Sequence, residues 1–166
     1  YDANDMMDSD LLLPDFIGIN DIETWSMMKL PLKISMGPYA FPINETLNNK
    51  VSLWKGDITN LEVDCIVNAA KNSLLGGDGV DKAIHRAAGP RLNEYVQKRK
   101  LTCPTGKAVL TDGFDCAALN IIHTVGPTNG DPSTLSQCYK ACLDIVAVKK
   151  IRSIAFCCIA TGVYGM

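Results

Sequence analysis

The sequence lacks an excess of charge of either sign. Its 16 Lys and Arg residues against 18 Asp and Glu residues leave a net charge of −2, and its pI is about 5.6. A large non-specific nucleic-acid surface needs clustered basic residues, so we do not expect one. A phosphate-rich small ligand remains compatible with mild acidity, because backbone amides can hold phosphate without a basic patch.

Metal-ligand spacing is also missing. The two histidines, His85 and His123, lie apart from the seven cysteines, which contain no pair of C-x-x-C units. We therefore expect no metal site. Buried free thiols in a reducing compartment fit better than a disulfide framework, because two of the cysteines are adjacent and four lie in apolar stretches. Those four are Cys65, Cys142, Cys157 and Cys158.

Targeting and cofactor signals are equally scarce. The apolar run at residues 11–13 stops at Pro14 and is no secretory signal, and no run is long enough to span a membrane. The G-x-G-x-x-G spacing of nucleotide-cofactor oxidoreductases is absent. We expect an intracellular protein, cytoplasmic or nuclear. A mitochondrial location stays open, because the sequence starts with Tyr1 and so reads as a piece of something longer.

The chain does have enough apolar material for one domain, with 47% hydrophobic residues among 166. Residues 1–46 have no strong period and contain four prolines, which indicates an N-terminal extension. We expect one short helix there, at residues 21–28, with Trp25 and Phe41 packing the segment. The domain itself is predicted to run from residue 47 to residue 166.

Strands and helices alternate from residue 51 onward, which predicts an α/β domain with a mainly parallel central sheet. The strands are expected at residues 51–54, 65–68, 107–110, 120–125 and 153–159, the last buried on both sides. Helices are expected at residues 79–88 and 91–100, and from Asp131 onward, where Asp-Pro is a favourable helix start. The apolar face of this last helix comprises Leu135, Cys138, Tyr139, Cys142, Leu143 and Val146.

Two loops of small residues each follow a strand. Gly76, Gly77 and Gly79 can adopt positive φ, and the helix after them offers free N–H groups, so this loop suits a phosphate. The second loop covers residues 160–165. Ligands of such sheets lie beyond the carboxyl ends of the strands, and the two loops are therefore predicted to hold one ligand between them.

The chain resembles the macrodomains, specifically the MacroD-type ADP-ribose-binding hydrolases. The matching segments are LWKGDITNLEVDCIVNAA at residues 53–70, LLGGDGVDKAIHRAAGP at 74–90, PTGKAVLTDGF at 104–114, IIHTVGP at 121–127 and IRSIAFCCIATGVYG at 151–165. The resemblance implies a three-layer α/β/α fold with a mixed, mainly parallel sheet, a cleft for ADP-ribose, and no cofactor. The family continues further, so we expect the chain to be truncated at Met166.

The resemblance also implies binding roles. Asp57, between Gly56 and Ile58, would accept a hydrogen bond from the amine of adenine, since a carboxylate is a pure acceptor; without the resemblance, it reads as a turn residue. The two loops would wrap the diphosphate and the distal ribose, on which Tyr164 would pack. The other residues implied are Asn68, Ala69, Ala70, Gly76, Gly77, Asp78, Gly79, Val80, Ala160, Thr161, Gly162, Val163 and Gly165.

Asp81 matches the catalytic aspartate of the family, and His85 lies one helical turn later on the same face. Such an aspartate would orient or deprotonate a water that attacks the anomeric carbon of a ribose esterified to a protein Asp or Glu. For His85 a structural and a functional role are equally open. His123, inside an apolar strand, reads as structural.

Three positions depart from the family pattern: Lys71 replaces Asn, Asp78 replaces Gly and Lys82 replaces Gly. An ammonium only donates hydrogen bonds, whereas an amide also accepts them, so Lys71 is a departure at a candidate catalytic position. Asp78 adds a side chain where positive φ is expected, and a charge near the diphosphate; Lys71 would neutralise one or the other. We expect ADP-ribose binding to be weakened but present, and hydrolysis to be slowed or abolished.

The predicted function is hydrolysis of the ester between mono-ADP-ribose and protein Asp or Glu side chains, with deacetylation of O-acetyl-ADP-ribose as a second activity that related proteins perform. One alternative is a non-catalytic reader of ADP-ribose or of ADP-ribosylated proteins, which Lys71 favours. Another is an interaction domain that has lost the ligand. No membrane partner and no direct nucleic-acid binding are expected.

Overall fold

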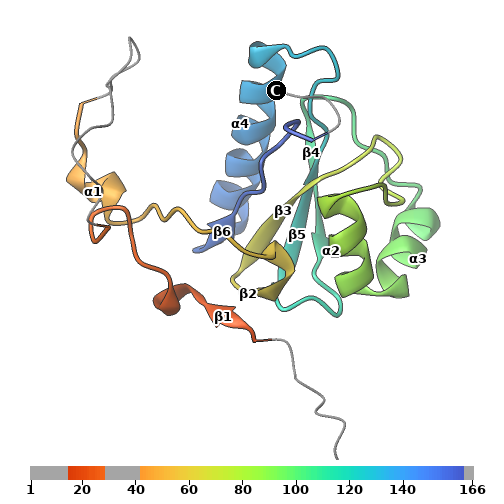
Figure 1. The fold of residues 1–166 in the computed structure, drawn as a ribbon. Coiled ribbons are helices and arrows are strands. Elements are labelled where there is room, and N and C mark those ends of the chain that lie inside the picture. Colours follow the sequence, from red (N-terminus) through yellow and green to blue (C-terminus); the bar gives the residue numbers. More distant parts are fainter. Residues whose placement is uncertain (1–14, 29–41, 163–166) are drawn as a thin grey trace, which may run out of the picture.

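The computed structural model of the 166-residue chain describes residues 15–28 and 42–162. Its centre is a four-stranded sheet with the order β4-β5-β3-β6 (Figure 1). β3 (Cys65–Ala69) lies parallel to β5 (Asn120–Thr124) and to β6 (Ile154–Ala155), whereas β4 (Ala108–Asp112) lies antiparallel to β5. The mixed, mainly parallel sheet predicted from the sequence is confirmed.

Helices cover both faces of this sheet and complete three layers, as expected (Figure 1). α2 (Val80–Ala88) and α3 (Pro90–Arg99) pack on one face, and α4 (Pro132–Lys149) packs on the other. Side chains along β3 point alternately to the two faces of the sheet. Ile66 packs on the side of α2, while Cys65 and Val67 pack on the side of α4. Asn68 shares the face of Ile66 and is fully buried.

α2 and α3 begin and end near the predicted residues, and α4 begins directly after Asp131, as predicted. Gly79, with φ of +58°, precedes α2, and Gly89, with φ of +72°, separates α2 from α3. The Asp131 carboxylate caps α4 by accepting hydrogen bonds from the N–H groups of Ser133 and Thr134. One residue of the predicted apolar face is wrong: Leu143 is 50% exposed, because the face of α4 that packs on the sheet is narrower than the sequence pattern suggested.

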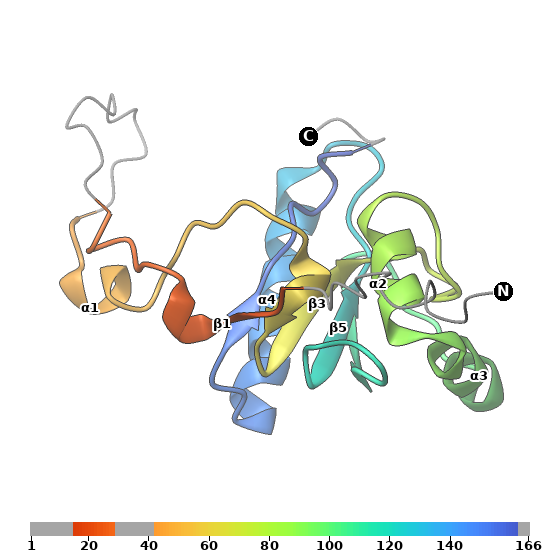
Figure 2. The same cartoon turned by 60° about the horizontal axis from the view of Figure 1, so that its bottom comes forward.

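The N-terminal part is built from short elements that lie to one side of the central sheet (Figures 1 and 2). β1 (Ile17–Gly18) pairs in parallel with β2 (Leu61–Glu62), a 3-10 helix follows at Ile19–Asp21, and α1 covers Glu45–Asn48. Two apolar side chains of this part, Ile17 and Ile22, contact the core.

Two predicted elements in this region are wrong. Residues 21–28 form a turn at 25–27 and not a helix; Thr24 O accepts hydrogen bonds from the N–H groups of Met27 and Met28 in this turn. Residues 51–54 are not a strand, because Val51 and Leu53 are exposed and the segment pairs with no described strand. Phe41, expected to pack this part, lies outside the described residues. The domain boundary after residue 46 stays a prediction.

The predicted strand at residues 153–159 is reduced to the two residues of β6, because only Cys65 and Ile66 of β3 pair with it. The chain then leaves the ladder, so Cys157 is half-buried and Cys158 is exposed, in contrast to the buried positions expected for both. The other two predicted buried thiols, Cys65 and Cys142, are buried, and all seven cysteines are free.

Two features are absent from residues 15–28 and 42–162. No helix among them has the length and apolar character needed to cross a membrane. The same residues contain no group of three His, Cys, Asp or Glu side chains that could hold a metal ion.

Candidate functional site

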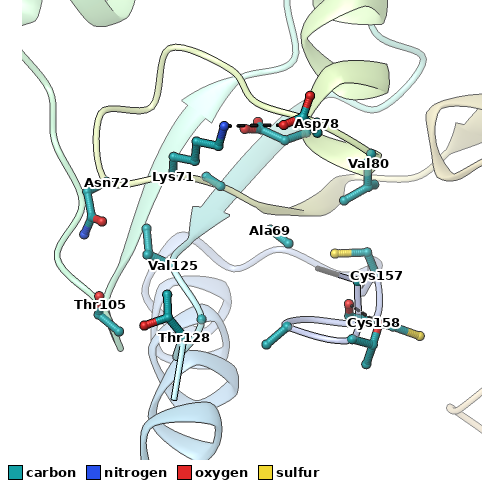
Figure 3. A pocket seen from close by; sticks show the side chains of 17 residues that line it. Ala69, Lys71, Asn72, Asp78, Val80, Thr105, Val125, Thr128, Cys157 and Cys158 are labelled. Atoms are coloured by element: carbon teal, nitrogen blue, oxygen red, sulfur yellow. Dashed lines mark hydrogen bonds and ion pairs between the residues drawn. The ribbon is translucent and has the colours of Figure 1, made fainter. Parts of the chain in front are cut away.

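A cavity of about 590 Å³ opens where β3 and β5 end (Figure 3). Ala69 and Ala70 enter it from the end of β3, and Val125 and Gly126 enter it directly after β5. The loop after β6 and the first turn of α2 form further walls. The cavity therefore lies at the carboxyl edge of the parallel strands, where the sequence placed the ligand.

The glycine-rich loop reaches the cavity through backbone conformations that glycine favours. Gly76 has φ of +93° and Gly79 has φ of +58°, whereas Asp78 is not in the positive-φ region, contrary to expectation. A Cβ at Gly77 would lie 2.9 Å from Asp81 Oδ2, so the backbone of this loop passes directly against the Asp81 carboxylate. Gly79 is the N-cap residue of α2 and has no side chain. The first N–H groups of that helix therefore have no side-chain acceptor from the N-cap.

Asp81 occupies the first turn of α2, lines the cavity and is only 2% exposed. Its Oδ1 accepts a hydrogen bond of 2.7 Å from Asn68 Nδ2. His85 Nε2 lies 3.3 Å from the same oxygen, in a contact without hydrogen-bond alignment. The other oxygen, Oδ2, is buried and has no hydrogen-bond partner among the described residues. The predicted proximity of Asp81 and His85 on one helix face is confirmed.

The surroundings of Asp81 favour its charged form. Burial alone works against ionisation, but the contact with His85 and the hydrogen bond from Asn68 outweigh it and hold the pKa of the Asp81 carboxyl below its ordinary value. Asp81 is therefore a carboxylate at neutral pH, with one oxygen held by Asn68 and the other without a hydrogen-bond donor among the described residues.

Lys71 and Asp78 form an ion pair at the rim of the cavity, with 3.6 Å between Lys71 Nζ and Asp78 Oδ2 (Figure 3). Both side chains are largely exposed, so the pair adds little stability. Lys71 was predicted to neutralise either Asp78 or the diphosphate, and in this structure it pairs with Asp78. Lys82, the third departure from the family pattern, is exposed.

The predicted site residues fall into four groups, the last of which is Gly56, Asp57 and Ile58. The cavity lining includes Ala69, Ala70, Lys71, Asp78, Gly79, Val80, Asp81, Ala160, Thr161 and Gly162. Behind it lie Asn68, Gly76, Gly77 and His85: Gly76 packs on the His85 ring, and Gly77 packs on Asp81. Val163, Tyr164 and Gly165 fall outside the described residues.

Gly56, Asp57 and Ile58 are not part of the lining. Asp57 Oδ1 accepts hydrogen bonds from Thr59 N, at 3.0 Å, and from Thr59 Oγ1, at 2.7 Å, and thereby caps the 3-10 helix Ile58–Asn60. These two bonds lower the pKa of the Asp57 carboxyl. Asp57 thus has the turn role that the sequence left open, and its contact with adenine stays a prediction.

Seven residues that line the cavity were not predicted from the sequence as site residues: Asn72, Thr105, Val125, Gly126, Thr128, Cys157 and Cys158. Most could have been found from topology, because Val125 to Thr128 follow β5 and the two cysteines follow β6. Thr105 precedes β4, whose antiparallel direction brings its start to the same edge. Burial raises the pKa of the Cys157 thiol to about 11, which keeps it protonated and a poor nucleophile.

Comparisons with known proteins agree with this arrangement. The family model described as "Macro domain" matches residues 67–166. Two relatives are "ADP-ribose glycohydrolase MACROD1" of Bos taurus, 45% identical over 91% of this chain and 48% of the relative, and "ADP-ribose glycohydrolase MACROD2" of Homo sapiens, 53% identical over 74% of this chain and 30% of the relative. The chain thus spans about half, or less, of the length of these two relatives.

A solved structure, the Trypanosoma brucei macrodomain in complex with ADP-ribose, has the same fold with a TM-score of 0.74 and 36% identity. The match covers 92% of this chain and 58% of that one. The chain belongs to the macrodomain family.

Proposed function

We propose that the cavity binds ADP-ribose and that Asp81 promotes hydrolysis of the ester between mono-ADP-ribose and a protein Asp or Glu side chain. The observation that carries this proposal is the buried Asp81 carboxylate: Asp81 lines a cavity of about 590 Å³, and its Oδ2 has no hydrogen-bond partner among the described residues. A charged acceptor without a donor costs free energy, so this oxygen is suited to a bound water or hydroxyl.

In the proposed reaction a water held by Asp81 Oδ2 attacks the anomeric carbon of the distal ribose. Asp81 accepts the proton of the water, the bond from the anomeric carbon to the ester oxygen breaks, and the electron pair leaves with the protein carboxylate. A carboxylate is a stable leaving group, so the reaction does not depend on a strong general acid. The contribution of the protein is to place the water and the ribose in line.

The diphosphate would lie at the N-terminus of α2. That helix begins at the rim of the cavity, and its N-cap residue, Gly79, offers no competing side-chain acceptor. Backbone N–H groups and the helix dipole stabilise phosphate there without a cluster of basic residues. The names of the relatives, which are ADP-ribose glycohydrolases, and the ligand of the Trypanosoma brucei structure support this choice.

A second function, a non-catalytic reader of ADP-ribose, is favoured by the Lys71–Asp78 ion pair. Asp78 places a negative charge at the rim of the cavity. The Lys71 ammonium pairs with Asp78 and is not free for the diphosphate unless the ligand displaces Asp78. Both effects weaken binding without abolishing it, whereas hydrolysis also loses the amide that the family uses at position 71, and this loss favours a reader over an enzyme.

Calorimetry with ADP-ribose tests the binding half of the proposal. We expect a weak but measurable affinity, and the absence of heat at near-millimolar ligand would overturn it. Release of label from a mono-ADP-ribosylated protein tests the catalytic half. Asp81→Asn is the matched control, because it keeps the shape of the side chain but cannot accept a proton.

The variant Lys71→Asn separates the enzyme from the reader. If the wild-type chain is a reader, the variant should gain turnover with little change in affinity, because the amide restores a group that both donates and accepts hydrogen bonds. If the wild-type chain is an enzyme that uses Lys71, the same variant should lose turnover. The label-release assay and calorimetry on the same preparations distinguish the two results.

We also propose an intracellular location, cytoplasmic or nuclear, with a mitochondrial one as the alternative. The seven free cysteines, four of them buried, support a reducing compartment. Microscopy of the tagged chain in its own cell would test this, and secretion would contradict it.

A further inference from the structure

A line of buried hydrogen bonds runs behind the cavity from α2 to β4. Asn68 Nδ2 donates to Asp81 Oδ1 at 2.7 Å and lies 3.1 Å from His123 Nδ1, while His123 Nε2 lies 3.0 Å from Thr111 Oγ1. Thr111 Oγ1 in turn donates to the carbonyl oxygen of Asp112 at 3.0 Å. Asp81, Asn68, His123 and Thr111 are each 3% exposed or less. We call these four residues the buried relay.

The chemistry of the groups fixes the direction of every bond in the buried relay. Asp81 is a carboxylate, so Asn68 must present its NH2 group to it, and the same nitrogen then faces His123 Nδ1 as a donor. His123 Nδ1 therefore carries a lone pair and Nε2 carries the proton. Nε2–H donates to Thr111 Oγ1, whose own hydrogen is taken by the Asp112 carbonyl. Burial lowers the pKa of His123 to about 4, so the ring is neutral near pH 7.

The opposite arrangement of protons would disturb Asp81. With the proton on Nδ1, His123 would point a donor at the NH2 group of Asn68, and relief would require the Asn68 amide to turn over. Its oxygen would then lie about where Nδ2 now lies, 2.7 Å from Asp81 Oδ1, with two acceptors face to face. Asn68 and His123 are register partners in β3 and β5, so the backbone cannot easily separate them.

We propose that His123 and Thr111 are positioning residues for Asp81: Thr111 holds the proton of His123 on Nε2, and this tautomer keeps the NH2 group of Asn68 aimed at the Asp81 carboxylate. Neither residue lines the cavity. The inference depends on the proposed function for what Asp81 does, but the proton positions themselves can be measured without any substrate.

The first experiment is the nitrogen NMR spectrum of the 15N-histidine-labelled full chain at neutral pH. The two ring nitrogens of His123, assigned with His123→Asn, should show a protonated Nε2 and an unprotonated Nδ1. A protonated Nδ1 would overturn the proposal outright. This measurement needs no folded variant beyond the one used for assignment, and His85 provides a second histidine in the same spectrum for comparison.

The second experiment compares Thr111→Val with Thr111→Ser. Valine matches the shape of threonine but leaves Nε2–H without an acceptor, whereas serine keeps the hydroxyl and loses only a methyl group. We expect the pKa of Asp81, followed by carboxyl 13C NMR and assigned with Asp81→Asn, to shift upward in Thr111→Val and to stay near the wild-type value in Thr111→Ser. Equal pKa values in the two variants would contradict the proposal, because a purely structural role would affect only stability.

A second matched pair tests His123 itself. In His123→Asn the new carbonyl oxygen takes the place of Nδ1 and can still accept from Asn68, whereas in His123→Gln the amide takes the place of Nε2. Asparagine should preserve the pKa of Asp81 better than glutamine, and the reverse order would contradict the proposal.

If label release is detected in the wild-type chain, Thr111→Val should lower kcat about tenfold to a hundredfold with a smaller change in KM, because it disturbs the orientation of Asp81 and no contact with ligand. Thr111→Ser should stay within about threefold of wild type. Absence of turnover in every variant and in the wild type would contradict the proposed hydrolysis, while the NMR results would still decide the buried relay.

Discussion

His123 makes the stability of the fold depend on pH. Its pKa is about 4 in the folded chain against an ordinary value of 6.5, because burial disfavours the charged ring. Between these two values the unfolded chain binds a proton that the folded chain does not bind. The free energy of unfolding should therefore fall as the pH drops from 6.5 towards 4, by up to about 1.4 kcal/mol per pH unit.

Urea denaturation at several pH values across this window checks the prediction, and His123→Asn is the control. The variant lacks the titrating ring, so its stability should change less over the same range. Parallel curves for wild type and variant would show that other groups cause the pH dependence.

Gly77 tests how closely the loop presses on Asp81. The Cβ of Gly77→Ala would lie 2.7 Å from Lys71 Cε and 2.9 Å from Asp81 Oδ2. The end of Lys71 can move away at little cost, but the buried Asp81 cannot. If Asp81 is catalytic as proposed, a displacement of about 1 Å at its carboxylate should lower turnover on the order of 10²-fold, with a smaller effect on the thermal midpoint.

Gly162→Ala is a control for stability alone, because Gly162 lines the cavity but a Cβ there would meet no atom of the described residues within 4 Å. Thermal denaturation should be measured on both variants, and label release on Gly77→Ala and the wild type. Equal turnover in Gly77→Ala and in the wild type would mean that Asp81 is not held as the structure describes.

The residues of the candidate site were predictable where one local rule was enough. The spacing of Asp81 and His85 places both on one face of α2, and in the structure His85 Nε2 lies 3.3 Å from Asp81 Oδ1. The hydrogen bonds of Asn68 to Asp81 and His123 could not be predicted in this way, because they join residues 13 and 55 positions apart in the sequence. Only the register of β3 against β5 brings them together.

At the scale of elements, the connection between β4 and β5 depends on Gly113. A Cβ at this position would lie 1.9 Å from the carbonyl oxygen of Ala118 and 3.0 Å from the carbonyl carbon of Leu119. Both are backbone atoms, so Gly113→Ala must displace the whole connection. We expect it to lower the free energy of unfolding by about 2 kcal/mol or more. Urea denaturation against Gly162→Ala as control would measure this, and equal stability of the two would contradict the packing.

Among the strands, those with a neighbour on both sides were predicted best. β3 pairs with β5 and with β6, and β5 pairs with β3 and with β4; both were found within one residue of their bounds. Residues 51–54 have a strand-like composition, but a strand also needs a neighbour, and composition alone carries no information about neighbours. The predicted strand at 153–159 is only two residues long for the same reason, because only Cys65 and Ile66 of β3 pair with it.

At the scale of the whole molecule, the segment around β1 ties the N-terminal part to the domain. β1 pairs with β2, and Ile17 and Ile22 contact the core. A chain that starts at residue 15 keeps these contacts, whereas one that starts at residue 23 loses them. The shorter chain should be less stable by about 1–3 kcal/mol, which is the value of burying part of two isoleucines. Thermal denaturation of both chains measures the difference, and identical midpoints would show that β1 is dispensable.

The buried His123 has a further consequence for heat measurements. Between pH 4 and 6.5 each molecule that unfolds exposes this ring and takes up a proton, and the buffer must supply it. The enthalpy recorded by a calorimeter in this range therefore includes the ionisation heat of the buffer, and it should differ between two buffers at the same pH. The size of that difference counts the protons taken up, and subtracting the value for His123→Asn leaves the contribution of this one ring in the middle of the sheet.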